Sequence, residues 1–164
     1  MAPLPILRWP DRRLATPCAP VGAVTEAVRR LAADMLDTMY AAPGRGLAAP
    51  QVGVLSRLFV MDVAWKEGAP QPVVCIDPQI LAEAPEMALA EEACLSLPGL
   101  AAEIARPAAI TLAWTETDGT RRQAELDGIA ARCAQHEIDH LDGRVILDRV
   151  DRETRARLEA AFAP

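Results

Sequence analysis

His136 and His140 are the only histidines of the chain, and they lie four positions apart with Glu137 between them. Residues four apart on a helix share one face, with Cβ atoms about 5 to 6 Å apart, so two imidazoles at this spacing can bind one metal ion. The H-E-x-x-H spacing also points Glu137 towards that ion, where a carboxylate can serve as a general base. The pattern therefore predicts a metal site with its own base, and it leaves the third ligand and the reaction open.

The third ligand is sought among four cysteines, at positions 18, 75, 94 and 133. Cys133 shares the helix face, but it lies about 10 Å along the axis from His140, too far for both to bind one ion. Cys18 follows a proline in a turn-rich segment and Cys75 lies in an apolar strand pattern, as structural thiols do. Cys94, in EEACLSLPG, could reach a helix from a neighbouring strand, so spacing alone makes it a candidate and no more.

Hydrophobic periodicity predicts three helices that organise the chain. The first begins after Thr25, a suitable N-cap, and ends at Pro43-Gly44, with one apolar face formed by Val28, Leu31, Met35 and Met39. The second opens at Asp127-Gly128 and carries both histidines. A third helical pattern covers residues 153–162.

Strands are predicted where β-branched and apolar residues gather, at residues 57–63 and 72–77, and residues 79–97 are expected to be extended. An Asp118-Gly119 pair predicts a hairpin over residues 109–126. Because strands and helices do not alternate regularly, the predicted class is α+β with a mostly antiparallel sheet. With 164 residues and 51% hydrophobic composition, we expect one domain, residues 1–164.

Charge and hydropathy exclude several functional classes. A formal net charge of −6 argues against direct nucleic-acid binding, because such surfaces are usually basic. The sequence contains no apolar run of about 18 residues and no signal-peptide pattern, so we expect a cytoplasmic protein without a membrane segment. In that compartment the cysteines are expected to be thiols.

Three segments resemble the signature motifs of the peptide deformylase family, in the family's order: GRGLAAPQ at 44–51, EACLS at 92–96 and QHEIDHLDG at 135–143. The N-terminal ILRWPDRRLATPCAPV is also similar, so the resemblance covers nearly the whole chain. It implies that Cys94, His136 and His140 hold one divalent metal ion within mostly antiparallel sheets around a central helix. Iron(II) is the expected metal, and zinc, nickel or cobalt can substitute because a thiolate with two imidazoles suits all four.

The resemblance further implies an enzyme, a peptide deformylase or formylmethionine amidohydrolase. It would remove the formyl group from the N-terminal formyl-methionine of newly synthesised polypeptides. The expected substrate is an N-formyl-methionyl peptide or nascent chain, met during transient association with the ribosome. We expect a monomer.

The resemblance also assigns roles around the metal. Glu137 would take a proton from the attacking water and deliver it to the departing amine. The side-chain amide of Gln51 and the backbone N–H of Leu95 would stabilise negative charge on the formyl oxygen. The peptide would add as a strand beside the glycine-rich loop, at Gly44, Arg45 and Gly46.

Three further charged residues lie near these motifs. Glu92 and Arg106 are expected either to form a buried pair that braces the Cys94 strand or to remain two solvated charges. Asp139 lies two positions from Glu137 and cannot face the same way, so it is expected on the helix surface or behind the ligands.

Three positions depart from the family's usual pattern: Ala93 replaces a glycine, Arg45 a small aliphatic residue, and Ala101 the basic side chain of some members. A glycine at position 93 would serve either a positive φ or close approach of another chain. These departures leave the ligands and base intact and bear on substrate preference.

Two alternatives follow from these departures: a paralogue acting on another formylated or acylated amine, and a non-catalytic metal-binding member of the fold. The full set of ligands and base argues against the second. An H-E-x-x-H protease is disfavoured because Cys94 lies upstream of the motif.

Overall fold

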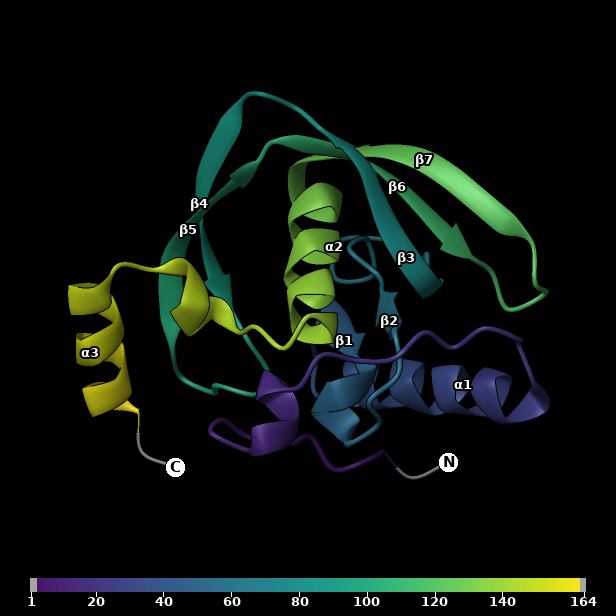
Figure 1. Ribbon diagram of the computed structural model, residues 1–164, viewed down its shortest axis with the longest axis horizontal. Coiled ribbons are helices and arrows are strands. Elements are labelled where there is room, and N and C mark those ends of the chain that lie inside the picture. The colour runs from purple at the N-terminus through teal and green to yellow at the C-terminus, as the bar shows by residue number, and fades with distance from the viewer. Residues whose placement is uncertain (1–2, 163–164) are drawn as a thin grey trace.

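The computed structural model describes residues 3–162, with helix α2 (Gly128–Leu141) at its centre (Figure 1). A five-stranded sheet and a separate two-stranded sheet surround this helix, and every strand pair in both is antiparallel. This arrangement confirms the predicted α+β class with mostly antiparallel sheets around a central helix.

The five-stranded sheet has the order β1-β2-β3-β6-β7. Its strands are β1 (Gly46–Ala48), β2 (Leu58–Met61), β3 (Val73–Glu83), β6 (Ala109–Thr115) and β7 (Arg121–Asp127). The hairpin predicted at Asp118-Gly119 joins β6 to β7, with Gly119 at φ +87 as such a turn requires.

β3 is longer than predicted, because it continues beyond an irregularity at Asp77 instead of ending there. Asp77 has φ 48, and its carboxylate accepts the backbone N–H groups of Val21 and Gly22 at 2.7 and 3.0 Å. These hydrogen bonds offset the backbone strain expected of a residue other than glycine in this region.

The two-stranded sheet pairs β4 (Met87–Ala93) with β5 (Ala101–Pro107). The prediction that residues 79–97 are extended is wrong in two places. The chain turns between β3 and β4, and it turns again from Leu95 onwards. No strand was predicted at β5. Its alternating buried side chains, Ala102, Ile104 and Arg106, include a charged residue that hides the pattern.

Two outer helices agree with the sequence analysis. Helix α1 (Glu26–Ala41) begins where the Thr25 hydroxyl accepts the Val28 N–H at 3.3 Å, and it buries Met35 and Met39. Helix α3 (Arg152–Ala161) is capped by Asp151, which accepts the Thr154 N–H at 2.7 Å. Within residues 3–162, no helix combines the length and the apolar character that crossing a bilayer demands.

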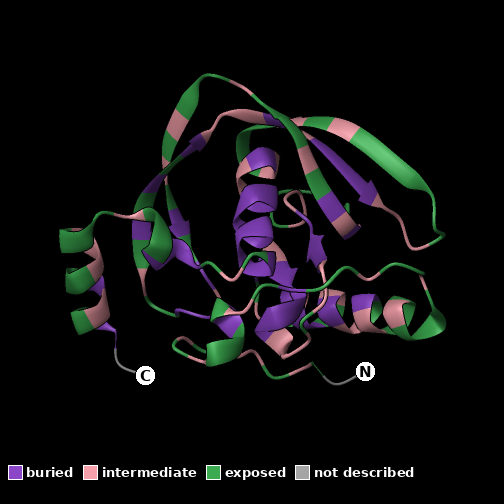
Figure 2. Cartoon of the chain, in the orientation of Figure 1, coloured by how far each residue is buried: buried purple, intermediate pink, exposed green. Residues whose placement is uncertain are grey.

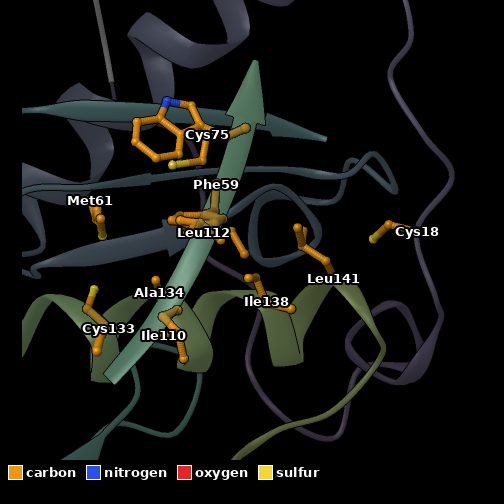
Figure 3. Close-up of a cluster of buried hydrophobic side chains, with 13 residues drawn as sticks. Cys18, Phe59, Met61, Cys75, Ile110, Leu112, Cys133, Ala134, Ile138 and Leu141 are labelled. Carbon is orange, nitrogen blue, oxygen red and sulfur yellow. The ribbon is translucent and has the colours of Figure 1, made fainter. Parts of the chain in front are cut away.

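Helix α2 is buried on nearly all sides (Figure 2). One face packs Cys133, Ala134, Ile138 and Leu141 against the side chains of β2 and β6, including Phe59, Ile110 and Leu112 (Figure 3). Its other side carries His136, Glu137 and His140, which are also buried. Because buried polar groups need partners, this polar face must be matched by groups from elsewhere in the chain.

Candidate metal centre and active site

The structure brings Cys94, directly after β4, to the two histidines of α2. One ligand atom from each residue lies within 4.8 Å of the others, and Cys94 Sγ is 3.4 Å from His140 Nε2. Ligand atoms around a tetrahedral ion with bonds of about 2.0 to 2.3 Å stand roughly 3.3 to 3.8 Å apart. The three side chains therefore fit one metal ion after small adjustments.

Glu92 orients the first histidine. Its Oε1 accepts a hydrogen bond from His136 Nδ1 at 2.9 Å, which leaves Nε2 as the ligand atom. A carboxylate behind a ligating imidazole fixes the tautomer and raises the basicity of the ligand. Sequence reasoning placed Glu92 near the Cys94 strand, but it did not identify this contact.

The electrostatics of the pocket also favour a cation. Burial alone would lower the pKa of His136, but the negative charges of Glu137, Cys94 and Glu92 outweigh it and raise that pKa well above the usual value. Burial and the charge of His136 together lower the pKa of His140 well below the usual value. A potential that holds a proton on His136 also attracts a divalent ion, which displaces that proton on binding.

Glu137, the expected base, follows His136 directly on α2. Its carboxylate is buried, and Oε1 has no hydrogen-bond partner within the described residues 3–162. Burial, as the largest cause, raises the pKa of Glu137 to about 7, an effect that a bound cation would oppose. Because Glu137 lines the cavity, a carboxylate with an unpaired oxygen is suited to accept a proton there.

Glu92 and Arg106 form the predicted buried pair, and the alternative of two solvated charges is wrong. Arg106 Nε donates to Glu92 Oε2 at 2.6 Å and Nη2 donates to Oε1 at 2.9 Å. Arg106 Nη1 also donates to Asp139 Oδ2 at 2.9 Å, so Asp139 lies behind the ligands. Although burial would raise the pKa of Glu92, its hydrogen bonds from His136 and Arg106 lower that pKa to about 2.

Arg132, which sequence reasoning missed, ties α2 to both strands of the β4–β5 hairpin. Its guanidinium donates to Glu92 Oε2 at 2.6 Å, to the Ile104 carbonyl at 2.9 Å and to the Ala88 carbonyl at 2.8 Å. The available signal was its spacing, since Arg132 lies four residues before His136 and so on the same helix face.

Gln51 lies beside the ligand thiol in a fixed orientation. Its Oε1 accepts the Ala48 N–H at 2.9 Å, and its Nε2 donates to Ser96 Oγ at 3.0 Å and lies 3.8 Å from Cys94 Sγ. Leu95 follows Cys94, and its N–H donates no hydrogen bond to the backbone of residues 3–162. Ser96, which holds the Gln51 amide, was not identified from the sequence.

A cavity of about 590 Å³ opens over these groups, and the glycine-rich loop forms one of its walls. A Cβ at Gly46 would stand 2.5 Å from Glu137 Oε2, and one at Gly44 would stand 2.8 Å from Leu95 Cδ1. Close approach therefore requires a glycine at Gly46, whereas at Gly44 the contact is with the flexible end of the Leu95 side chain. Arg45 between them also lines the cavity.

Gly46→Ala should reduce kcat at least about tenfold while metal content stays near that of the wild type, because the new methyl displaces the Glu137 carboxylate. Steady-state kinetics and metal analysis of the same preparation would test this. The matched control is Gly68→Ala, whose Cβ would meet no atom closer than 3.9 Å. Full activity of Gly46→Ala would show that Glu137 can move without loss.

Ala93 does not strain the backbone, so one of the two reasons considered for a glycine at this position is wrong. Among residues 3–162, Asp77 is the sole residue other than glycine with positive φ. Ala93 is the exposed last residue of β4, it pairs with Ala101, and it lines the cavity. Its methyl therefore affects the width of the groove rather than the geometry of the neighbouring ligand.

A profile of the polypeptide deformylase family matches residues 3–156. The chain belongs to the peptide deformylase family. The chain is 43% identical to a peptide deformylase of Afipia carboxidovorans over 99% of this chain and 95% of that protein. It is 47% identical to one from Alkalilimnicola ehrlichii over 96% of this chain and 88% of that protein.

The structural comparison agrees with the sequence comparison. The crystal structure of Ehrlichia chaffeensis peptide deformylase in complex with actinonin superposes with a TM-score of 0.92 at 36% identity, covering 98% of this chain and 96% of that one. The predicted family is thus confirmed. In this member of the peptide deformylase family, the Cys/His/His group provides a site for a divalent metal.

Proposed function

We propose that this chain is a peptide deformylase, a metal-dependent hydrolase that removes the formyl group from N-terminal formyl-methionine. The observation that carries the proposal is the Cys94, His136 and His140 group, whose ligand atoms lie within 4.8 Å of one another. Glu137 lines the same cavity of about 590 Å³ as Cys94 and His136. A member that only binds metal would gain nothing from a base at that position.

The proposed mechanism gives each side chain a separate task. Cys94, His136 and His140 would hold a divalent ion, which would supply an activated water and polarise the formyl carbonyl. Glu137 accepts the water's proton at its unpaired Oε1 and then delivers it to the nitrogen of the departing amine. Glu92 is not available as an alternative base, because its carboxylate already accepts hydrogen bonds from Arg106, Arg132 and His136.

The developing charge on the formyl oxygen needs donors that are already in place. Gln51 Nε2 and the Leu95 N–H are the proposed donors, and Gln51 is held by hydrogen bonds on both ends of its amide. The peptide pairs as an added strand with the loop formed by Gly44, Arg45 and Gly46, which lines the cavity.

Nascent formylated chains are the proposed substrates, so we also propose that the protein acts in the cytoplasm as a monomer that meets the ribosome transiently. N-terminal processing during protein synthesis is the corresponding role.

The proposed activity is tested with anaerobic, metal-loaded protein on formyl-Met-Ala-Ala and on its acetyl counterpart. We expect turnover of the formyl peptide and at least about a hundredfold lower kcat/KM for the acetyl peptide, because the extra methyl must enter the narrow space between the ligands and Gln51. Equal rates would favour a paralogue with another acylated substrate. Stoichiometric metal without turnover of either peptide would favour the non-catalytic alternative.

Iron(II) is the metal we propose, since one thiolate and two imidazoles suit it together with zinc, nickel and cobalt. The iron-loaded protein should lose activity in air, through oxidation of the ion or of Cys94, while the nickel-loaded protein persists. Inactivation half-lives of the two forms in the same aerated buffer measure the difference. Equal half-lives would argue against iron as the labile centre.

A further inference from the structure

The loop of residues 62–72, between β2 and β3, is docked on the glycine-rich wall of the cavity. The Asp62 N–H donates to the Arg45 carbonyl at 2.8 Å, and Trp65 Nε1 donates to the Gly44 carbonyl at 2.9 Å. Tyr40 in turn donates its hydroxyl hydrogen to Asp62 at 2.6 Å and packs edge-on against Trp65. The loop is therefore held in a defined position at the rim of the groove.

The loop provides a hydrogen-bond partner for only part of the Arg45 guanidinium. Its Nη2 donates to Glu67 Oε1 at 2.6 Å, but the Glu67 side chain is 67% exposed and that of Arg45 is 33% exposed, so solvent weakens the pair. Arg45 Nε is buried and has no hydrogen-bond partner in the described part of the chain, residues 3–162. A guanidinium that is paired through one N–H can still donate other N–H groups to a second carboxylate.

Lys66 adds a second positive charge to the same rim. It lines the cavity next to Arg45, and its ammonium lies 5.7 Å from the Trp65 ring centre. Glu67 does not line the cavity, whereas Glu91, exposed on β4, does. The loop thus adds one positive charge beside Arg45 to a lining that also contains Arg132 and the carboxylates of Glu91, Glu92 and Glu137.

The net charge of −6 on the whole chain does not cancel the local positive charge of Arg45 and Lys66. Exposed charges more than about 8 to 10 Å away are largely screened at physiological ionic strength, whereas a carboxylate in the groove would lie in direct contact with the loop. Local contacts therefore decide which peptides the rim favours.

We propose that Arg45 and Lys66 form a carboxylate-binding rim that selects formylated peptides with an acidic group after the methionine. The inference rests on the proposed deformylase function and adds its substrate preference. The carboxylate competes with the exposed Glu67 for the Arg45 guanidinium, which is one-third exposed. Two sources offer this chemistry, an acidic side chain and the terminal carboxylate of a short peptide.

The test compares kcat/KM of the metal-loaded enzyme on four peptides that separate these sources. The peptides are formyl-Met-Ala-Ala-amide, the same peptide as the free acid, formyl-Met-Glu-Ala-amide and formyl-Met-Lys-Ala-amide. At low salt we expect the Glu peptide to exceed the Lys peptide by at least about threefold, and 0.5 M salt should reduce this ratio. A gain for the free acid alone would assign the rim to the terminal carboxylate.

Three variants then assign the preference to the rim. Arg45→Gln should bring the Glu-to-Lys ratio towards one, and Glu67→Gln should raise the ratio because it removes the competing carboxylate. Arg122→Gln makes the same charge change as Arg45→Gln on β7, outside the cavity lining, and should leave the ratio unchanged. Opposite shifts in the first two variants are not expected of a loop that is merely structural.

A wild-type ratio near one with no advantage for the free acid would overturn the inference, as would a ratio that Arg45→Gln leaves unchanged. Absence of turnover with all four peptides would contradict the proposed function itself, which is a different result from equal turnover of all four.

Discussion

Replacing Glu137 with glutamine should lower kcat on a formyl-Met peptide by about 10² to 10⁴-fold while the bound metal remains. Glutamine keeps the shape of the side chain but cannot accept a proton. The other carboxylate closest to the ligands, Glu92, is held by Arg106, Arg132 and His136, so it cannot take over. Single-turnover kinetics with parallel metal analysis would measure the loss.

Glu103→Gln is the matched control, because it is the same change at an exposed residue of β5 that does not line the cavity. We expect it to change kcat less than about threefold, since an exposed surface charge contributes little. If Glu137→Gln kept kcat within tenfold of the wild type, the proposed proton transfer at Oε1 would have to be abandoned.

Cys94→Ala should remove stoichiometric metal from the purified protein. Two imidazoles from one helix remain, and a divalent site of this kind needs at least three protein ligands to hold its ion tightly. Metal content by elemental analysis, together with a competition assay against a chelator, would quantify the loss.

Cys133→Ala is the corresponding control, and it should retain the metal. The Cys133 thiol donates to the Arg45 carbonyl at 3.6 Å and belongs to the core cluster of Figure 3. Although it also lines the cavity, it is not one of the three residues whose ligand atoms come together. Loss of metal from the Cys133 variant, with retention in the Cys94 variant, would reverse the ligand assignment.

The parts of the fold that follow from local patterns were predictable. The N-cap of α1, the apolar residues Met35 and Met39, and the turn at Gly119 each depend on chemistry within a few residues. Strand β5 was missed because one of its inward positions is Arg106, whose burial makes sense only with Glu92 and Asp139 in place. Those partners come from distant segments, so periodicity could not reveal them.

The metal ligands show the same limit. Helical spacing alone indicated His136 and His140 as ligands and disfavoured Cys133. These conclusions could be drawn from the sequence because they need only the geometry of one helix. Cys94 remained a candidate until the family resemblance assigned it, since only the tertiary structure places the end of β4 beside α2. The contact between Glu92 and His136 and the loop around Trp65 required the folded chain.

The β4–β5 hairpin forms its own two-stranded sheet, yet it carries the thiol while α2 carries both imidazoles. A bound ion would therefore act as a cross-link between two segments that otherwise meet through Arg106, Arg132, the hydrogen bond between His136 and Glu92, and packing. The free energy of metal binding includes that of docking the hairpin onto the helix. Docking of the hairpin and binding of the ion thus stabilise each other. A substitution that loosens the docking therefore weakens metal affinity, even when it lies far from the ion.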